Sequence, residues 1–248
     1  MTSTVLVTGA NRGIGLELAR QYAADGWQVI ATARDPAEAA ELQSLQAASD
    51  GRVRVETLDL ADFATIDSLA AALGDAVVDV VISNGAQFGP RDDSTTDLPR
   101  RLRGQLFGSV DHAAMLETIR VNAIAPLHLA EKLRPNLQRS PQGKLVMISS
   151  SAGSIAGGLQ WDSPVQLFVY PVSKAMLNKV TATLSMVLKA DGIVTVALCP
   201  GHVRTRLGGP GASLSPAESA AGLRRVIGGL TSADNGRFIR FDGAAVAW

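Results

Sequence analysis

Short hydrophobic runs alternate with longer amphipathic stretches along the whole chain. The runs are rich in valine and isoleucine, as expected of strands covered on both faces, and the stretches between them repeat apolar residues at helical spacing. Strands are predicted at residues 5–7, 27–33, 53–57, 77–83, 144–148, 193–198 and 237–241, and helices at 16–23, 36–48, 61–73, 112–137 and 170–190. This order predicts an α/β fold: one Rossmann-type domain over residues 1–248, with a doubly wound parallel sheet of about seven strands and helices on both faces.

A glycine-rich turn joins the first predicted strand to the first helix. Its sequence is Thr8-Gly9-Ala10-Asn11-Arg12-Gly13-Ile14-Gly15. Glycines permit a tight turn and a close approach of the backbone to a ligand, and the free N–H groups at a helix start attract a phosphate. This placement favours dinucleotide binding over an ordinary turn. The predicted contacts are Gly9, Asn11, Arg12, Gly13, Ile14 and Gly15.

The end of the second strand bears on the choice between NAD(H) and NADP(H). An acidic residue at this place holds the ribose of NAD, whereas an arginine accommodates the 2′-phosphate of NADP. The first candidate is Arg34, and Arg12 offers a second guanidinium to the same phosphate. We therefore predict a preference for NADP(H), while Asp35 leaves NAD(H) possible.

The ends of the third and fourth strands add polar and small residues to the same edge of the sheet. Asp59 follows the third strand and either contacts the adenine or caps the next helix. Asn84 and Gly85 follow the near-continuous apolar run of the fourth strand. Because the carboxyl ends of parallel strands meet at one edge, we predict cofactor contacts from Asp59, Leu60, Asn84 and Gly85.

Tyr170 and Lys174 lie at the head of the last long predicted helix. Their spacing places both side chains on one face, one turn apart. A neighbouring ammonium favours the phenolate of a tyrosine, whose unperturbed pKa is about 10, and so permits proton transfer near neutral pH. The same spacing is common in surface pairs. A functional role for the pair is favoured by Ser150, which follows the fifth strand and is expected to face the same crevice.

Two irregular segments flank the predicted crevice. Residues 87–108, an insertion of unusual length for a connection, suggest a lid or a surface excursion. Residues 205–217 are rich in glycine and are predicted to form a mobile loop over the substrate. His202 is interpreted as a turn or pocket contact rather than a base, and Trp161 either shapes an apolar pocket or packs within its own loop.

Composition narrows the function further. Lys plus Arg equals Asp plus Glu at 23 each, which leaves no net charge to hold nucleic acid or an acidic membrane. The lone Cys199 cannot form an internal disulfide, and no histidine and cysteine cluster has metal-site spacing, so we expect a cytoplasmic protein without a metal. No apolar run is long enough to span a membrane, and we expect no membrane partner.

Taken together and in this order, the motifs resemble those of the short-chain dehydrogenase/reductase family over essentially the full length. Thr8 to Gly15 is similar to the family's TGxxxGxG loop, and Asn84-Gly85-Ala86 to a variant of its NNAG motif. The resemblance also assigns a catalytic tetrad of Asn122, Ser150, Tyr170 and Lys174, and nicotinamide contacts from Pro200, Gly201, Val203 and Thr205. Within the family, the chain looks most like the C-factor and sniffer-like carbonyl reductases.

The resemblance implies hydride transfer between NADP(H) and a small to medium carbonyl compound or secondary alcohol, with Tyr170 as general acid/base. Ser150 would bind the substrate oxygen, Lys174 would lower the pKa of Tyr170 and hold the ribose, and Asn122 would position a water that relays protons. The alternative is an NADP(H)-binding signalling or sensor protein with vestigial catalysis. The broad apolar face of residues 170–190 predicts a homodimer or homotetramer through the helices around Asn122 and Tyr170.

Overall fold

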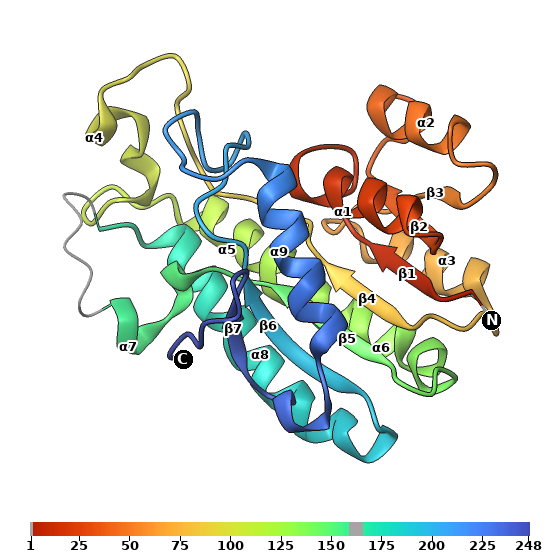
Figure 1. The fold of residues 1–248 in the computed structure, drawn as a ribbon. Helices are drawn as coiled ribbons and strands as arrows, with labels where there is room; N and C mark the ends of the chain where they lie inside the picture. Colours follow the sequence, from red (N-terminus) through yellow and green to blue (C-terminus); the bar gives the residue numbers. More distant parts are fainter. Residues whose placement is uncertain (1, 159–165) are drawn as a thin grey trace.

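The computed structural model describes residues 2–158 and 166–248. It contains a sheet of seven strands in the order β3-β2-β1-β4-β5-β6-β7, and every neighbouring pair is parallel (Figure 1). The predicted doubly wound α/β sheet is therefore confirmed. The strands are β1 (Thr4–Val7), β2 (Gln28–Ala33), β3 (Val53–Thr57), β4 (Val80–Ser83), β5 (Lys144–Ile148), β6 (Val194–Cys199) and β7 (Phe238–Arg240).

Helices cover both faces of the sheet because each central strand buries its side chains on alternate sides. Val5 and Val7 pack on one side with α1, α2 and α9, whereas Leu6 between them packs on the other side with α3, α6 and α8. Two large hydrophobic cores result, one on each face. The helices are α1 (Gly13–Ala24), α2 (Ala40–Ala47), α3 (Phe63–Leu73), α4 (Leu98–Arg101), α5 (His112–Ile119), α6 (Ala125–Gln138), α7 (Ile155–Gly158), α8 (Val169–Val187) and α9 (Pro216–Gly229).

Helices α2 and α9 differ from the sequence prediction. The helix expected from residue 36 begins only at Ala40, because Pro36 lies in a turn whose amide at Ala37 donates to the Asp35 carboxylate at 3.0 Å. Helix α9 was not predicted, although its start carries a capping box in which the Ser215 hydroxyl and the Glu218 carboxylate cap each other's backbone N–H. Its apolar spacing was obscured by the glycine-rich segment that precedes it.

The long helix predicted over 112–137 is present but is interrupted. Residues Arg120–Ile124 form a π-helical segment between α5 and α6, and Asn122 lies at its centre. A π segment inserts an extra residue into the turn and is common at functional sites. The Asn122 side chain is buried here, with a relative exposure of 1%.

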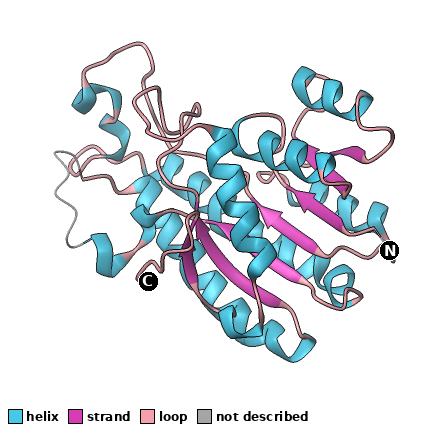
Figure 2. Ribbon diagram, viewed as in Figure 1, coloured by secondary structure: helices cyan, strands magenta, loops and turns pink. Residues whose placement is uncertain are grey.

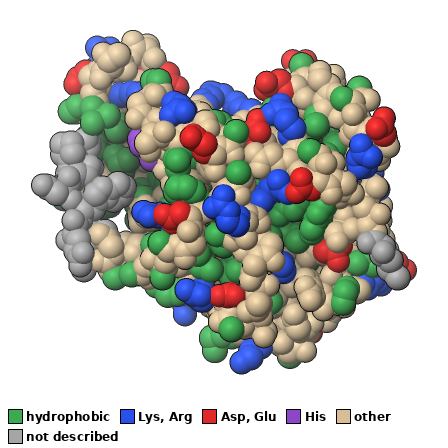
Figure 3. All heavy atoms as spheres, viewed as in Figure 1, with side chains coloured by type: hydrophobic (Ala, Val, Ile, Leu, Met, Phe, Trp, Pro, Cys, Tyr) green, Lys and Arg blue, Asp and Glu red, His purple; other side chains and the backbone are tan. Residues whose placement is uncertain are grey.

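The loops that follow the strands gather at the carboxyl edge of the sheet (Figure 2). The insertion, residues 87–108, is mostly loop around the short α4, and it faces the loop that follows β6. Basic and acidic side chains are interspersed over the face shown in Figure 3, in keeping with the equal numbers of each. Among the residues that the structure describes, no helix is long and apolar enough to cross a membrane.

Candidate active site

A large cleft opens at the carboxyl ends of β1, β4, β5 and β6. Its volume is about 1490 Å³, which exceeds an ordinary small-molecule pocket and leaves room for a dinucleotide with a second molecule. The cleft lies where the strand order reverses, between β1 and β4, as the topology of a doubly wound sheet requires. Predicted residues on its wall are Gly9, Asn11, Arg12, Gly13, Ile14, Asn84, Gly85, Ser150, Tyr170, Lys174, Pro200, Gly201, Val203 and Thr205.

The glycine turn is fastened to the end of β4. The Thr8 hydroxyl accepts the backbone N–H groups of Asn84 and Gly85 at 2.9 and 3.1 Å, and the Asn84 amide donates to the carbonyl oxygens of Thr8 and Gly9 at 3.0 and 3.2 Å. A Cβ on Gly9, whose φ is +64°, would lie 2.8 Å from the Cα of Gly85. A Cβ on Gly15 would lie 2.3 Å from the Gly9 carbonyl oxygen. The glycine turn, residues 8–15, therefore forms a cradle in which the protein backbone can come close to a ligand.

This cradle fits the diphosphate of a dinucleotide. Arg12 occupies the N-cap position of α1 and makes no side-chain capping hydrogen bond, so the N–H groups of the first turn remain available to a phosphate. Thr205, from the loop after β6, packs against the turn: its methyl carbon would lie 3.2 Å from a Cβ on Gly13. The turn predicted to bind a phosphate and the segment predicted to contact the nicotinamide thus meet.

Three arginines, Arg12, Arg34 and Arg206, lie close enough to repel one another beside the glycine turn. Burial, followed by repulsion from Arg206 and Arg34, lowers the pKa of the Arg12 guanidinium. Arg12 and Arg206 lie on the cleft wall, whereas Arg34 is exposed at the end of β2 and lies off it. Mutual repulsion among three cations favours an anion between them. Arg206 was not predicted, because no local pattern distinguishes it from an ordinary loop arginine.

Four further predicted residues lie off the cleft wall: Gly15, Asp59, Leu60 and Asn122. The Asp59 carboxylate accepts the Ala61 N–H at 2.9 Å, while the N-cap of α3 is Asp62. Leu60 is buried, and its side chain packs against Gly85. Asp59 therefore holds the turn after β3, and Leu60 supports the turn after β4, without facing the cleft.

The structure brings Ser150, Tyr170 and Lys174 together at the centre of the cleft. The hydroxyls of Tyr170 and Ser150 are hydrogen-bonded to each other, and the Lys174 Nζ lies 5.8 Å from the centroid of the Tyr170 ring. Lys174 is 2% exposed, and its Nζ donates to the Ile148 carbonyl oxygen at 2.9 Å. The predicted geometry of a tyrosine and a lysine on one helical face is therefore present.

Burial dominates the ionisation of both groups. It raises the pKa of the Tyr170 phenol, and the hydrogen bond from Ser150 opposes that shift. Burial also lowers the pKa of the Lys174 ammonium to about 8. Ser150 therefore lowers the Tyr170 pKa in this structure, and the lowering by Lys174 stays a prediction. The phenol keeps its proton at neutral pH, as a general acid must.

Asn122 uses its whole amide to hold two neighbouring segments. Its oxygen accepts the Gln87 N–H at 2.8 Å, and its nitrogen donates to the Gln87 carbonyl oxygen at 2.7 Å and to the Ser173 hydroxyl at 2.9 Å. The Ser173 hydroxyl in turn donates to the Tyr170 carbonyl oxygen at 2.7 Å. Asn122 therefore clamps the chain at Gln87 to α8 beside Tyr170, and its positioning of a proton-relay water stays a prediction.

The loop after β6 folds back on itself beside the cleft. The Gly201 φ is +80°, and a Cβ there would meet the side chain of Leu214 at 2.6 Å. The His202 ring nitrogen Nε2 lies 3.0 Å from the Gly208 carbonyl oxygen, so this histidine holds the turn, as interpreted from the sequence. Trp161 lies outside the described residues.

The insertion supplies wall residues that the sequence did not single out. The Phe88 ring packs against the Tyr170 ring with centroids 5.1 Å apart, and Arg91 lies over Phe88 at 5.7 Å. An aromatic residue soon after a strand end was the available signal for Phe88. Gln105 is fully buried within the insertion, and no sequence pattern marks it.

Comparison with known proteins assigns the chain to a family. A profile of the short chain dehydrogenase family matches residues 3–212, so the chain belongs to that family. It is 36% identical to C-signal of Myxococcus xanthus over 141 residues, which cover 57% of this chain and 82% of that protein. It is also similar to the carbonyl reductase Sniffer of D. melanogaster.

Sniffer shares 27% identity and a TM-score of 0.85, and both chains are covered completely. The NADPH-bound carbonyl reductase from chicken fatty liver shares 32% identity and a TM-score of 0.84, covering 100% of this chain and 99% of that one. The predicted resemblance to C-factor and sniffer-like proteins is confirmed.

The buried ammonium gives a pH-dependent contribution to stability. In the unfolded chain a lysine has a pKa of about 10.4, so between pH 8 and pH 10 the unfolded state binds more protons than the folded state. Stability should therefore rise with pH in this window by roughly 2 kcal/mol. The buried phenol acts in the opposite sense only above about pH 10.

We expect Lys174→Met to remove this rise, measured as the free energy of unfolding in urea at pH 8, 9 and 10. Lys189→Met, at an exposed position, serves as the control and should retain the rise. Parallel pH profiles for the parent and Lys174→Met would show that the ammonium does not titrate in this range.

Proposed function

We propose that the protein is an NADP(H)-dependent oxidoreductase that interconverts a small to medium carbonyl compound and its secondary alcohol. The observation that carries the proposal is the hydrogen bond between Tyr170 and Ser150 beside the buried Lys174, in a cleft that begins at a glycine turn. Family membership and the NADPH-bound carbonyl reductase from chicken fatty liver support it.

When bound, the reduced nicotinamide supplies the hydride for the carbonyl carbon. Ser150 donates a hydrogen bond to the substrate oxygen and orients it. Tyr170 gives its proton to the same oxygen as the alcohol forms, and the nearby Lys174 stabilises the phenolate that remains. Asn122 contributes by holding Ser173, and through it the Tyr170 backbone.

Tyr170→Phe tests the assignment of the general acid. We expect NADPH-dependent turnover of aldehydes, ketones and diketones to fall by at least ~100-fold, because the proton donor is lost. NADPH affinity, followed by fluorescence titration, should stay within about twofold of the parent.

Tyr22→Phe is the matched control, because the chain has two tyrosines and Tyr22 is a buried residue of α1 that does not line the cleft. This variant should keep full turnover. Substantial activity in Tyr170→Phe would refute the assignment. Tight NADPH binding by a parent protein that is silent across the whole panel would instead favour the sensor function.

The preference for NADP(H) is proposed to come from the positive charge of Arg12 and Arg34, with Arg206 beside them. We expect Arg34→Asp to weaken NADPH binding about tenfold relative to NADH, because one cation is replaced by a charge that repels the 2′-phosphate. The ratio of the two dissociation constants measures the effect. Arg225→Asp makes the same charge change at an exposed position on α9 and should leave the ratio unaltered. An unchanged ratio in Arg34→Asp would make Arg34 a bystander.

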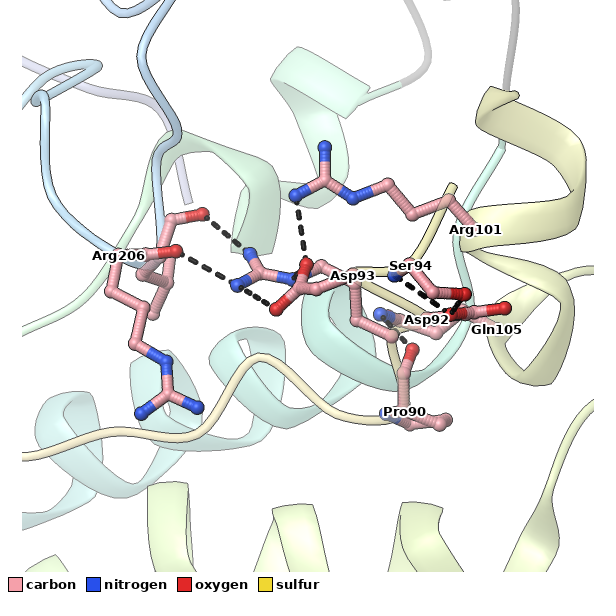
Figure 4. A network of polar contacts seen from close by, with 9 residues as sticks. Pro90, Asp92, Asp93, Ser94, Arg101, Gln105 and Arg206 are labelled. Carbon is pink, nitrogen blue, oxygen red and sulfur yellow. Dashed lines mark hydrogen bonds and ion pairs between the residues drawn. The ribbon is translucent and has the colours of Figure 1, made fainter. Parts of the chain in front are cut away.

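We also propose that the insertion acts as a lid that engages the 205–217 loop. Arg91 donates to the carbonyl oxygens of Arg206 and Leu207 at 2.9 and 3.4 Å, and its Nε lies 2.7 Å from the Asp93 carboxylate (Figure 4). Asp93 is also paired with Arg101 at 2.9 Å, so both guanidiniums converge on one carboxylate. The network bridges the cleft between two segments distant in sequence.

Arg91→Met retains an apolar stem over Phe88 but loses the hydrogen bonds to the loop. We expect the NADPH dissociation rate, measured by stopped-flow fluorescence, to rise about fivefold, since contacts that hold a closed state act mainly on the rate of release. Arg100→Met, at an exposed position of the same insertion, should leave the rate unchanged. An unaltered rate in Arg91→Met would remove the lid role from this network.

Self-association through the helices around Asn122 and Tyr170 is proposed as well. Apolar side chains are exposed on these helices, among them Leu116 on α5 at 69% and Met186 on α8 at 78%. Covering them removes apolar surface from water. Sedimentation velocity should therefore give a mass above that of a single chain, and a monomer at micromolar concentration would refute the proposal.

A further inference from the structure

Gln105 is a fully buried polar residue in a largely exposed part of the chain. It ends the 3₁₀ segment Arg103–Gln105 within the insertion, and its relative exposure is 0%. A buried amide is costly unless its oxygen and nitrogen both find partners. The partners of Gln105 therefore indicate why it is inside.

Those partners place Gln105 at the head of the catalytic helix. Its side-chain oxygen accepts the backbone N–H of Tyr170 at 3.2 Å, and its backbone carbonyl oxygen accepts the N–H of Phe168 at 2.9 Å. Phe168 is the N-cap of α8 and makes no side-chain capping hydrogen bond of its own. Gln105 thus satisfies free N–H groups at this helix start from a position 65 residues earlier in the chain.

The other end of the same amide holds the beginning of the insertion. Its nitrogen donates to the Pro90 carbonyl oxygen at 3.2 Å (Figure 4). Next to it, Gly89 has a φ of +93°, and a Cβ there would lie 2.7 Å from a methyl carbon of Val169. The chain at Phe88 to Pro90 is therefore held against the first turn of α8, with the Phe88 ring on the Tyr170 ring.

The Tyr170 backbone is consequently fixed from two sides. Gln105 binds its N–H, and the Ser173 hydroxyl, itself bound by Asn122, donates to its carbonyl oxygen. Phe88 restricts the ring. Because a displacement of about 1 Å at a reacting group can cost about 100-fold in rate, such fixation bears directly on proton transfer.

We propose that Gln105 is a positioning residue for Tyr170: it caps α8 from the insertion and so holds the phenol where it meets Ser150 and the reacting oxygen. The inference rests on the proposed function and deepens it. It assigns the insertion a second task besides that of a lid, which is to build the catalytic centre.

Gln105→Met tests the proposal, because methionine has nearly the same length and lacks both hydrogen-bonding groups. We expect kcat for the best carbonyl substrate to fall about tenfold, with KM for that substrate and the dissociation constant of NADPH within about twofold of the parent. Ser109→Ala is the control: it follows the insertion directly, and its hydroxyl donates to the carbonyl oxygens of Arg103 and Leu106 rather than to α8. It should keep the parental kcat.

A second measurement reports on the Tyr170 ring and does not depend on enzyme activity. With carbon-13 at the ring carbon that bears the hydroxyl, the chain has two tyrosine signals, which Tyr170→Phe assigns. Gln105→Met should shift or broaden the Tyr170 signal and leave the Tyr22 signal in place. A parental kcat with an unmoved Tyr170 signal would overturn the proposal. A parent that reduces no carbonyl would refute the proposed function alone, and the Tyr170 signal would still decide this inference.

Gln105→Glu decides the matter if Gln105→Met fails to fold. A protonated carboxyl can accept from the Tyr170 N–H and donate to Pro90, as the amide does, whereas an ionised one repels the Pro90 carbonyl oxygen. The ratio of its kcat to that of the parent should therefore fall as pH rises, and the Tyr170 signal should move over the same range. A kcat ratio that does not change with pH, together with a Tyr170 signal equal to that of the parent at every pH, would overturn the proposal.

Discussion

Parallel pairing of β1 with β4 is the contact on which the site depends, because the strand order reverses between these two strands. Val7 pairs with Ile82, so the turns that follow the two strands emerge side by side. The Thr8 hydroxyl and the Asn84 amide tie the turns together, and the close approach of the two turns leaves no room for a side chain at Gly9, where a Cβ would lie 2.8 Å from the Gly85 Cα. The cradle at the start of α1 is a consequence of this contact.

The catalytic centre is assembled by polar groups that the fold buries and satisfies. Asn122 joins the chain at Gln87 to α8, and Gln105 joins the insertion to the first turn of the same helix. Burial lowers the pKa of the Lys174 ammonium, and burial also keeps the Tyr170 phenol in its protonated form. Burial, hydrogen bonding and ionisation at this place are therefore parts of one arrangement.

The fold was largely predictable, because its signals are local and repeated. Seven apolar runs of strand character and the helical periodicity between them define the sheet and most helices. The errors occurred where local chemistry competes with periodicity. The Asp35 carboxylate holds a turn in place of an early start of α2, and a capping box at Ser215 begins α9 after a glycine-rich segment that conceals it.

The sequence by itself determined the order of strands and helices, the glycine turn and the spacing of Tyr170 and Lys174, since each depends on neighbours within a few residues. Only the tertiary structure decided that Asn122 acts as a clamp, that Arg206 joins Arg12, and that Gln105 reaches the head of α8. These contacts join segments far apart along the chain. Their partners are chosen by the packing of the whole sheet, which no local pattern of residues encodes.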